Sequence, residues 1–330
     1  MSFVAGAIAS AATAFLVTYF LTPLLIRYLN RHGKVVKDYH KPGDKKVPRP
    51  GGPSIIAGIV AAELVLFAFT MSTGVLAILF CTVIGFFVGY VDDRKVMPGY
   101  FKPLALVAAA VPIILLGAYD FNLDFPLVGS ARIPLLYIVL ILFAIPIVGN
   151  TVNSIDVLNG AVSGFIAIAS VPLILTLLLQ NKIDVAIAAL PLLLSALAFY
   201  RYHGYPSRIF PGDSGAVGWG AMYGAIAIVG GVEIVATVAL LPAVMNSFLF
   251  LVAVKRMAEH GEIKDRPTVL LDDYRLTASR EKGAPVTLVR LLLLRGPMRE
   301  EDITKSILKL TAFSAGMAML TAAMIIWVRI

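Results

Sequence analysis

Residues 134–152 read PLLYIVLILFAIPIVGNTV and contain no charged side chain. An apolar stretch of this length can cross the hydrocarbon core of a bilayer as one α-helix. Comparable stretches recur along the chain, whose 330 residues are 59% hydrophobic and 15% charged, with a mean hydropathy of +0.87. A chain of this composition is too apolar for a soluble domain of this length, so we predict an all-α polytopic membrane protein.

We expect about ten transmembrane helices in a single domain that comprises residues 1–330. The predicted spans, whose boundaries are soft, are 3–26, 54–72, 74–91, 103–118, 134–152, 161–179, 183–202, 214–230, 233–254 and 307–327. The first is too long for a cleavable signal peptide and lacks a basic segment before it, so we expect it to remain as a span. An even number of spans puts both termini on the same, outer side of the membrane.

Positive charge is distributed unevenly between the two sides of this topology. Of the 28 lysines and arginines, 25 fall in loops or helix ends on one side, and only Arg132, Lys182 and Arg329 fall on the other. The positive-inside rule makes the basic side cytoplasmic. The net charge of +8 is then explained by basic loops that face an anionic leaflet, so we expect membrane lipids and no nucleic acid as partners. The single Cys81 lies in a predicted span, which excludes a disulfide and a thiolate metal site.

Most predicted loops are short, with two exceptions. On the outer side, residues 119–133 are expected to hold a small hairpin. On the cytoplasmic side, residues 256–306 form the one sizeable extramembrane subregion. Within it, residues 267–276 suit a short strand pair, and residues 286–294 suit a helix that lies in the membrane interface.

The first cluster that could carry chemistry is Asp92-Asp93, at the end of the third span, with Lys102 ten residues after the first aspartate. Adjacent carboxylates at the membrane edge are costly unless they are solvated, paired or bound to a cation. Such a pair can divide the work between a base and a group that holds a cation or a lysine. A solvated turn is the alternative interpretation.

The second cluster is residues 149–160, GNTVNSIDVLNG, at the cytoplasmic end of the fifth span. Asn150, Asn153, Asp156 and Asn159 recur every three residues, which places them near one face of a helix or a 3₁₀ continuation. Their oxygens suit a hard cation such as Mg²⁺, and asparagine also recognises hydroxyls and amides. Helix capping and polar contacts between helices are the alternative.

Two further clusters lie in loops on the same side. Within residues 205–215, Asp213 is expected at the N-terminus of the eighth span, where the helix dipole favours an anion. It either holds a metal ion or is simply an N-cap. Asp38 and Lys41 precede the glycine- and proline-rich turn 48–53 and are either substrate contacts or solvated loop residues.

The fifth cluster contains Lys264 and Arg266, which face the same way if the segment is extended. An arginine there suits bidentate binding of a phosphate, and ordinary juxtamembrane basic residues are the alternative. Five polar clusters on five successive same-side loops predict one composite active site, built from cytoplasmic loops.

In this order the clusters resemble, nearly end to end, the polyprenyl-phosphate N-acetylhexosamine-1-phosphate transferase superfamily, of the glycosyltransferase family 4 type. Residues 205–213, YPSRIFPGD, and 286–293, VTLVRLLL, are most similar to the UDP-GlcNAc–dolichyl-phosphate GlcNAc-1-phosphate transferases. Asp156 instead follows the pattern of the bacterial phospho-MurNAc-pentapeptide translocases, and Arg49 replaces an acidic residue of the eukaryotic pattern. The mixture resembles archaeal members.

The resemblance implies transfer of GlcNAc-1-phosphate from UDP-GlcNAc to a polyprenyl (dolichyl-type) phosphate. The products would be polyprenyl-diphosphate-GlcNAc and UMP, in the first membrane step of N-glycan-type protein glycosylation. It also implies Mg²⁺, or Mn²⁺ in its place, a location in the cell membrane with the active site facing the cytoplasm, and a homodimer by analogy.

The same resemblance implies roles for the residues of each cluster. Catalytic roles fall on Asp92, Asp93 and Lys102, and metal ligation falls on Asn153 and Asp213. The residues implied to bind the nucleotide-sugar are Asn150, Asp156, Asn159, Gly160, Lys264 and Arg266. Asp38 and Lys41 are further candidate substrate contacts.

Two alternatives stay open. One is the same chemistry with another UDP-N-acetyl sugar as the donor. The other is a transporter or lipid flippase, which should carry ionisable groups near the middle of its spans. The predicted spans are almost free of such groups, with Glu63 and Glu233 as the main exceptions.

Overall fold

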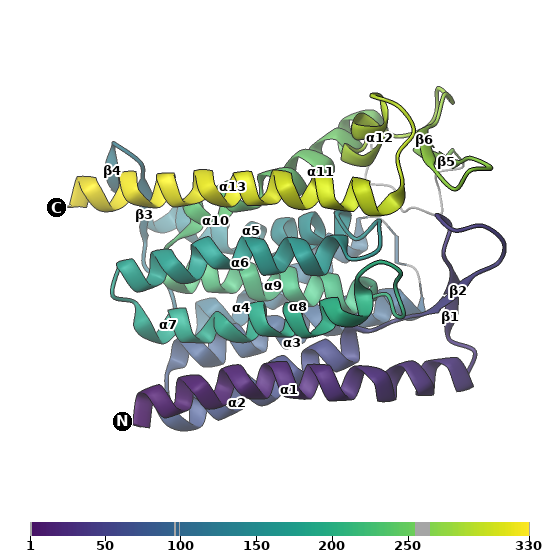
Figure 1. Cartoon of the computed structure of the whole chain (residues 1–330). Coiled ribbons are helices and arrows are strands. Elements are labelled where there is room, and N and C mark those ends of the chain that lie inside the picture. Colours follow the sequence, from purple (N-terminus) through teal and green to yellow (C-terminus); the bar gives the residue numbers. More distant parts are fainter. Residues whose placement is uncertain (1, 96, 99, 255–264, 330) are drawn as a thin grey trace.

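The computed structural model describes residues 2–95, 97–98, 100–254 and 265–329 as a bundle of helices that run nearly parallel to one another (Figure 1). Its helices are α1 (Ser2–Arg31), α2 (Gly52–Thr70), α3 (Thr73–Arg94), α4 (Phe101–Leu115), α5 (Pro134–Ser154), α6 (Ala161–Leu179), α7 (Ile183–Ala188), α8 (Leu190–His203), α9 (Gly212–Gly230), α10 (Glu233–Ala239), α11 (Leu241–Val254), α12 (Leu288–Leu293) and α13 (Glu300–Arg329). Its strands are β1 (Val35–Lys37), β2 (Lys46–Pro48), β3 (Asn122–Phe125), β4 (Gly129–Arg132), β5 (Thr268–Leu270) and β6 (Leu276–Ala278).

Each of the ten predicted apolar segments forms a helix or a broken pair of helices. Among the described residues, seven helical segments are long and apolar enough to cross a membrane, with α7 and α8 together as one of them. The count rises to eight if α10 and α11, bent by 71°, form one span. The protein is therefore a multi-pass membrane protein. The number ten stays a prediction, because α4 has only 15 residues and α9 falls outside both sets.

Helix α9 differs from the other long helices because nearly all of its residues are buried. Its sequence, GDSGAVGWGAMYGAIAIVG, places a glycine at several of its contacts with neighbouring helices. A Cβ on Gly220 would lie 2.7 Å from the Cα of Gly149 on α5. Small residues let helix backbones approach closely inside a membrane, and here they bring α9 against α3 and α5.

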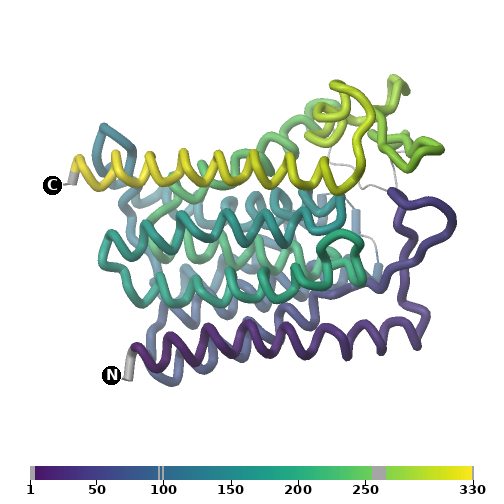
Figure 2. Tube along the Cα trace, viewed as in Figure 1, coloured from purple at the N-terminus to yellow at the C-terminus, as the bar shows by residue number. Residues whose placement is uncertain are grey.

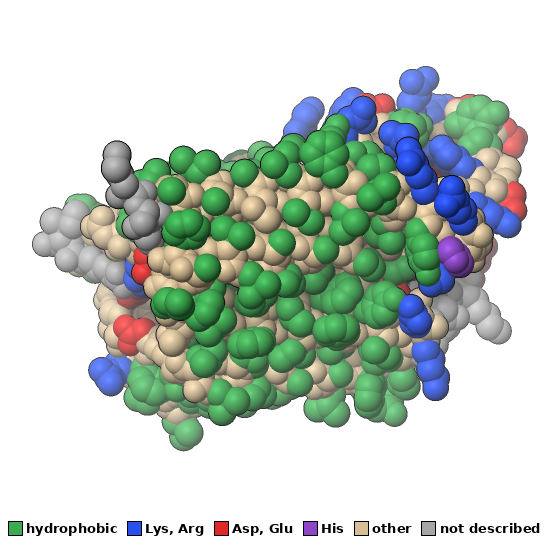
Figure 3. Space-filling model, turned by 90° about the horizontal axis from the view of Figure 1, so that it is seen from below, with side chains coloured by type: hydrophobic (Ala, Val, Ile, Leu, Met, Phe, Trp, Pro, Cys, Tyr) green, Lys and Arg blue, Asp and Glu red, His purple; other side chains and the backbone are tan. Residues whose placement is uncertain are grey.

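The two ends of the bundle are different. β1–β2, β5–β6 and α12 lie at one end, whereas α1 begins and α13 ends at the other, close to β3–β4 (Figures 1 and 2). Lysine and arginine side chains gather at the first end, which we call the basic end, and hydrophobic side chains cover the surface between the two ends (Figure 3). The start of α1 and the end of α13 therefore lie at the same end of the bundle, opposite the basic end. Which compartment each end faces stays a prediction.

The structure confirms the hairpin predicted within residues 119–133 and the strand pair and short helix predicted within residues 256–306, with adjusted boundaries. The outer hairpin pairs β3 with β4, and the strand pair of the basic end joins β5 to β6, which reaches Ala278. The expected interfacial helix is the shorter α12, whose Leu288, Val289 and Leu293 are buried against the protein. The N–H of Leu288 donates to Asn246 Oδ1 on α11 (2.9 Å), so α12 is fixed to the bundle.

Glu63 and Glu233, the two acidic residues within predicted spans, have different surroundings. Glu233, at the start of α10, bonds to the hydroxyl of Tyr137 at the end opposite the basic end. Glu63 is fully buried on α2, and its carboxyl oxygens have no hydrogen-bond partner among the described residues.

Candidate active site

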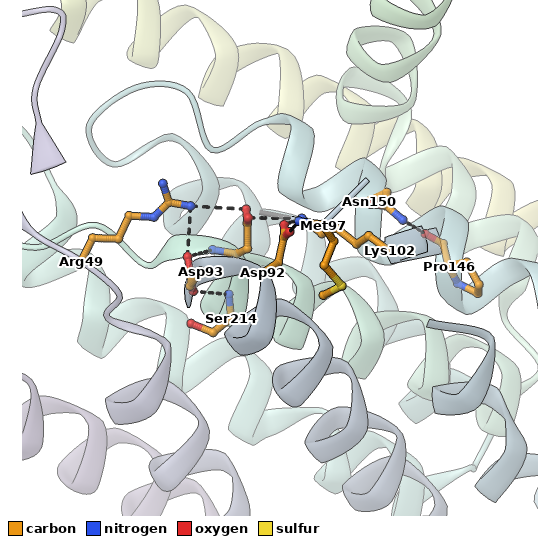
Figure 4. Close-up of polar contacts among 9 residues, drawn as sticks. Arg49, Asp92, Asp93, Met97, Lys102, Pro146, Asn150 and Ser214 are labelled. Atoms are coloured by element: carbon orange, nitrogen blue, oxygen red, sulfur yellow. Dashed lines mark hydrogen bonds and ion pairs between the residues drawn. The ribbon is translucent and has the colours of Figure 1, made fainter. Parts of the chain in front are cut away.

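The carboxylate of Asp92, in the last turn of α3, forms a buried pair with Lys102 of α4. Its Oδ2 accepts from Lys102 Nζ at 2.8 Å, and its Oδ1 accepts from the N–H of Met97 at 2.7 Å (Figure 4). Both side chains are almost completely buried. An ion pair removed from water needs such additional hydrogen bonds, and Asp92 has one.

Asp93, the next residue, contacts the N-terminus of α9 instead of Lys102. Its two oxygens accept the N–H groups of Asp213 (3.0 Å) and Ser214 (2.9 Å) in the first turn of α9, and its side chain is only 1% exposed (Figure 4). The N–H groups of a first helical turn have no partner within their own helix, so Asp93 caps α9 from α3. Gly212, at φ +71°, permits this approach because a Cβ there would lie 2.7 Å from Asp93 Oδ1. The two aspartates thus differ, and Asp92 lies against the lysine.

Asp213 joins the groups that α3 and α4 contribute. Its Oδ2 lies 3.3 Å from Lys102 Nζ, its Oδ1 lies 3.5 Å from Arg49, and its carboxylate is in hydrogen-bonding contact with Asn153. Asp213 lies in the first turn of α9, at the N-terminus of the helix as predicted, but the N-cap residue is Pro211, so Asp213 does not cap α9. Its side chain is 20% exposed and is the most accessible of the three carboxylates.

Asn150 and Asp156 flank Asn153 along the chain. The Nδ2 of Asn150 donates to the carbonyl of Pro146 (2.8 Å) within α5. Asp156 follows the helix and lies 3.7 Å from His203 Nε2. Burial raises the pKa of Asp156 to about 8; Arg49 opposes this shift, while Asp213 and Asp93 add to it. Asp156 therefore shares the electrostatic field of the other three groups.

Asn159 and Gly160 connect loops of the basic end. The side chain of Asn159 accepts from the N–H of Ser207 (2.7 Å) and donates to Asp38 Oδ2 (3.4 Å). Its N–H donates to Glu300 Oε1 (2.8 Å), and it is almost fully buried. Gly160 has φ +79°, which suits glycine. In this structure Asn159 is engaged within the protein, and its contact with a nucleotide stays a prediction.

Lys41 and Asp38 meet the start of α13. Lys41 forms an ion pair with Glu300 and lies 4.0 Å from the centre of the Tyr205 ring. Asp38, His40 and Glu300 place possible metal-ligand atoms within 4.8 Å of one another. Burial lowers the pKa of His40, and Glu300 and Asp38 partly offset this effect. Lys41 already neutralises Glu300, so this group is better explained as an ion-paired contact between the first loop and α13.

Arg266 lies outside the central group. Its guanidinium stacks on the ring of Tyr39 at 3.5 Å, next to Asp38 and His40 in the chain. Lys264, its predicted partner, and the nearby His260 are outside the described residues, so their arrangement is untested.

A cavity of about 180 Å³ opens beside these groups. It is lined by Lys37, Asp38, Tyr39, His40, Arg49, Asn153, Asp156, Val157, Leu158, Asn159, Phe210 and Asp213. The structure therefore brings the second, third and fourth same-side clusters together at one cavity, next to the Asp92–Lys102 pair of the first cluster. Sequence reasoning gave no site role to Arg49 or Glu300; their contacts join segments far apart in sequence and leave no local pattern.

The fold and site define a polytopic membrane enzyme with a cluster of acidic and basic groups at one end of its helices. The model of the family described as "Glycosyl transferase family 4" matches residues 75–231, the segment that contains Asp92, Lys102, Asn153 and Asp213. Over this segment, which is just under half of the chain, the protein is similar to that family of transferases.

Curated relatives extend the similarity over most of the chain. The "Putative UDP-N-acetylglucosamine--dolichyl-phosphate N-acetylglucosaminephosphotransferase" of Saccharolobus solfataricus is 25% identical over 295 residues, 88% of each chain. The "Phospho-N-acetylmuramoyl-pentapeptide-transferase" of Bacillus subtilis is 28% identical over 240 residues, 67% of this chain and 74% of its own. A protein of the same name from Geobacillus thermodenitrificans is 26% identical and covers 86% of this chain and 93% of its own.

Proposed function

We propose that the protein transfers GlcNAc-1-phosphate from UDP-GlcNAc to a polyprenyl (dolichyl-type) phosphate at the cytoplasmic face of the cell membrane. The products are polyprenyl-diphosphate-GlcNAc and UMP, and the reaction begins the assembly of an N-glycan-type lipid-linked glycan. The observation that carries the proposal is the Asp92–Lys102–Asp213 chain of contacts at the basic end of a membrane bundle, beside a polar cavity. The names of the relatives supply the substrate class.

The donor diphosphate and the acceptor lipid phosphate are both negatively charged. The site therefore has to bring them together in spite of their electrostatic repulsion. Lys102 is positioned to draw phosphate charge towards the ends of α3 and α9. Asp92 fixes the position of the Lys102 ammonium group. Of the two adjacent aspartates, it is also the better placed to accept a proton from the lipid phosphate. Since a lipid phosphate is largely ionised at neutral pH, positioning and charge neutralisation should contribute more than general base catalysis.

The residues present fit a divalent cation. Among the described residues, two close cations, Lys102 and Arg49, balance the three carboxylates of Asp92, Asp93 and Asp213. The most accessible of these carboxylates, that of Asp213, is in hydrogen-bonding contact with the amide of Asn153. Carboxylate and amide oxygens are the ligands that Mg²⁺ prefers. Asp213 and Asn153 would hold the ion, which when bound would neutralise diphosphate charge and stabilise the UMP leaving group.

In the proposed reaction, an oxygen of the lipid phosphate attacks the β-phosphorus of UDP-GlcNAc. The bond from that phosphorus to the bridging oxygen breaks, and the electron pair leaves with UMP. The protein holds both phosphates in line, through Lys102 and the capped N-terminus of α9, whose dipole favours negative charge. A homodimer stays a prediction from the family resemblance.

The test uses purified protein in detergent with Mg²⁺, dolichyl phosphate and labelled UDP-sugars, including UDP-GlcNAc and UDP-MurNAc-pentapeptide. We expect labelled sugar in the lipid phase together with released UMP from UDP-GlcNAc, and neither from Asp213→Asn. Lipid product from another donor would keep the reaction type and change the substrate, as the name of the Bacillus relative suggests. No UMP from any donor, with several acceptor lipids and a folded protein, would refute the proposal.

A further inference from the structure

Within the part of the chain that the structure describes, Arg49 is the one basic residue that bridges the first loop and the carboxylates of the central site. It follows β2, and its guanidinium nitrogen lies 3.1 Å from Asp93 Oδ1 and 3.5 Å from Asp213 Oδ1 (Figure 4). Its side chain is 36% exposed, although both carboxylates it touches are more buried. A partly exposed guanidinium thus supplies part of the charge balance of a buried acidic group.

The backbone around Arg49 is held independently of its side chain. The N–H of Arg49 donates to the carbonyl of Lys34 (3.2 Å), and the N–H of Gly51 donates to that of Phe210 (2.8 Å). Phe210 in turn donates its N–H to the carbonyl of Pro48 (3.0 Å). The side chain can therefore change its direction while the loop keeps its place.

The carboxylates differ in how much they need Arg49. Asp93 already accepts two backbone N–H groups from α9, so it keeps its hydrogen bonds without the guanidinium. Asp213 has Lys102 on its other oxygen, but that lysine is buried and tied to Asp92 at 2.8 Å. Of the two cations beside Asp213, Arg49 is the more distant and the more exposed, and so the one that can leave.

We propose that Arg49 is the displaceable counter-ion of the site: it pairs with Asp213 in the ligand-free protein and yields that carboxylate to a divalent cation. The inference rests on the proposed use of a divalent cation at Asp213. Cation and guanidinium then compete for one carboxylate, and positive charges a few ångströms apart repel each other. Arg49 consequently weakens metal binding in the absence of substrate.

The experiment measures Mn²⁺ binding by electron paramagnetic resonance, in detergent-solubilised protein without nucleotide. The variants are Arg49→Gln, Arg49→Met as a second neutral replacement, and Asp213→Asn. Lys46→Gln is the matched control, because Lys46 lies on the same hairpin and its ion pair among the described residues is with the exposed Asp44. Thermal unfolding shows whether each variant is folded.

We expect the neutral Arg49 variants to bind Mn²⁺ roughly tenfold or more tightly than the wild type, since one repelling unit charge is removed. Lys46→Gln should bind like the wild type, and Asp213→Asn should lose the site. Equal or weaker binding by both Arg49 variants would overturn the inference, and so would the absence of Mn²⁺ binding by any form. Transferase activity, measured in parallel, distinguishes the role of Arg49 from the proposed reaction. If the wild type forms product but the Arg49 variants show no change in Mn²⁺ affinity, only the role of Arg49 is overturned. If the Arg49 variants bind Mn²⁺ more tightly but the wild type forms no product, only the proposed reaction is overturned.

Discussion

Gly89 sets the distance between α3 and the beginning of α9, and its substitution by alanine tests whether that distance matters for catalysis. A Cβ on Gly89 would meet the carbonyl oxygen of Asp213 and would lie 2.7 Å from its carbonyl carbon and 2.8 Å from Ser214 N. These are backbone atoms, which cannot swing aside as a flexible side chain can. Ordinary contact begins at 3.4 Å, so relief of the closest contact, with the carbonyl oxygen of Asp213, requires the helices to separate by about 1 Å.

A shift of this size acts on the reacting groups directly, because Asp213 moves with the backbone that collides. Misplacement of a catalytic group by about 1 Å can lower the reaction rate about 100-fold, so we expect kcat of Gly89→Ala to fall roughly 10- to 100-fold. Overpacking should also lower the free energy of unfolding by about 1–3 kcal/mol. The assay is UMP release with UDP-GlcNAc and dolichyl phosphate, together with thermal unfolding in detergent.

Gly316→Ala on α13 is the control, because the added methyl group has no described atom within 4 Å apart from those of its own stretch of helix. It should keep both the activity and the stability of the wild type. If Gly89→Ala kept wild-type kcat while folded, the close approach of α3 and α9 would not position Asp213, and the reasoning would be wrong.

Three further changes test other parts of the site. Asp93→Ala leaves two N–H groups at the start of α9 without their acceptor, which should lower the free energy of unfolding by about 1–2 kcal/mol, measured by thermal unfolding. Burial raises the pKa of Asp156 to about 8, from an ordinary 3.8, so its stabilising contribution is full below pH 3.8 and is lost as the pH rises through 8. Relative to Asp156→Asn, the wild type should thus lose about 1.4 kcal/mol per pH unit between these limits in unfolding measurements. Lys41→Met leaves Glu300 buried without its ion pair and should cost about 3–5 kcal/mol, part of which the double variant with Glu300→Gln should recover.

Each of these predictions has its own contrary result. For Asp93→Ala, a loss no larger than that of the exposed Asp44→Ala would argue against the capping role. A stability difference for Asp156 that does not change with pH would mean that its carboxyl is not perturbed. For the Lys41 pair, additive single and double variants would mean that the two side chains act independently.

The apolar segments and the outer hairpin could be predicted from the sequence, because each depends on local pattern alone. The helix that begins at Gly212 places Asp213 in its first turn, as the residues 205–215 suggest. Spacing by three likewise brought Asn153 and Asp156 to the same cavity. These inferences needed only helix periodicity and the side on which each loop lies.

The division of work between Asp92 and Asp93 could not be predicted. Which of two adjacent carboxylates meets Lys102 and which caps α9 depends on how α3 is rotated against helices that follow much later in the chain. The pairing of Lys41 with Glu300, separated by 259 positions, is of the same kind. A sequence pattern shows which polar groups are available, and packing decides which of them pair.

The capping of α9 by Asp93 also has a consequence for biosynthesis. Asp92, Met97 and Lys102 are close in sequence and can associate as soon as α3 and α4 have entered the membrane. Asp93 lies 120 positions before the N–H group of Asp213 that it accepts, so the ribosome must add α9 before this contact can form. Until then the carboxylate of Asp93 lacks these two N–H donors and is balanced by Arg49, which precedes it in the chain. The last step in assembling the site is therefore the docking of α9 onto a partner that is already charge-paired.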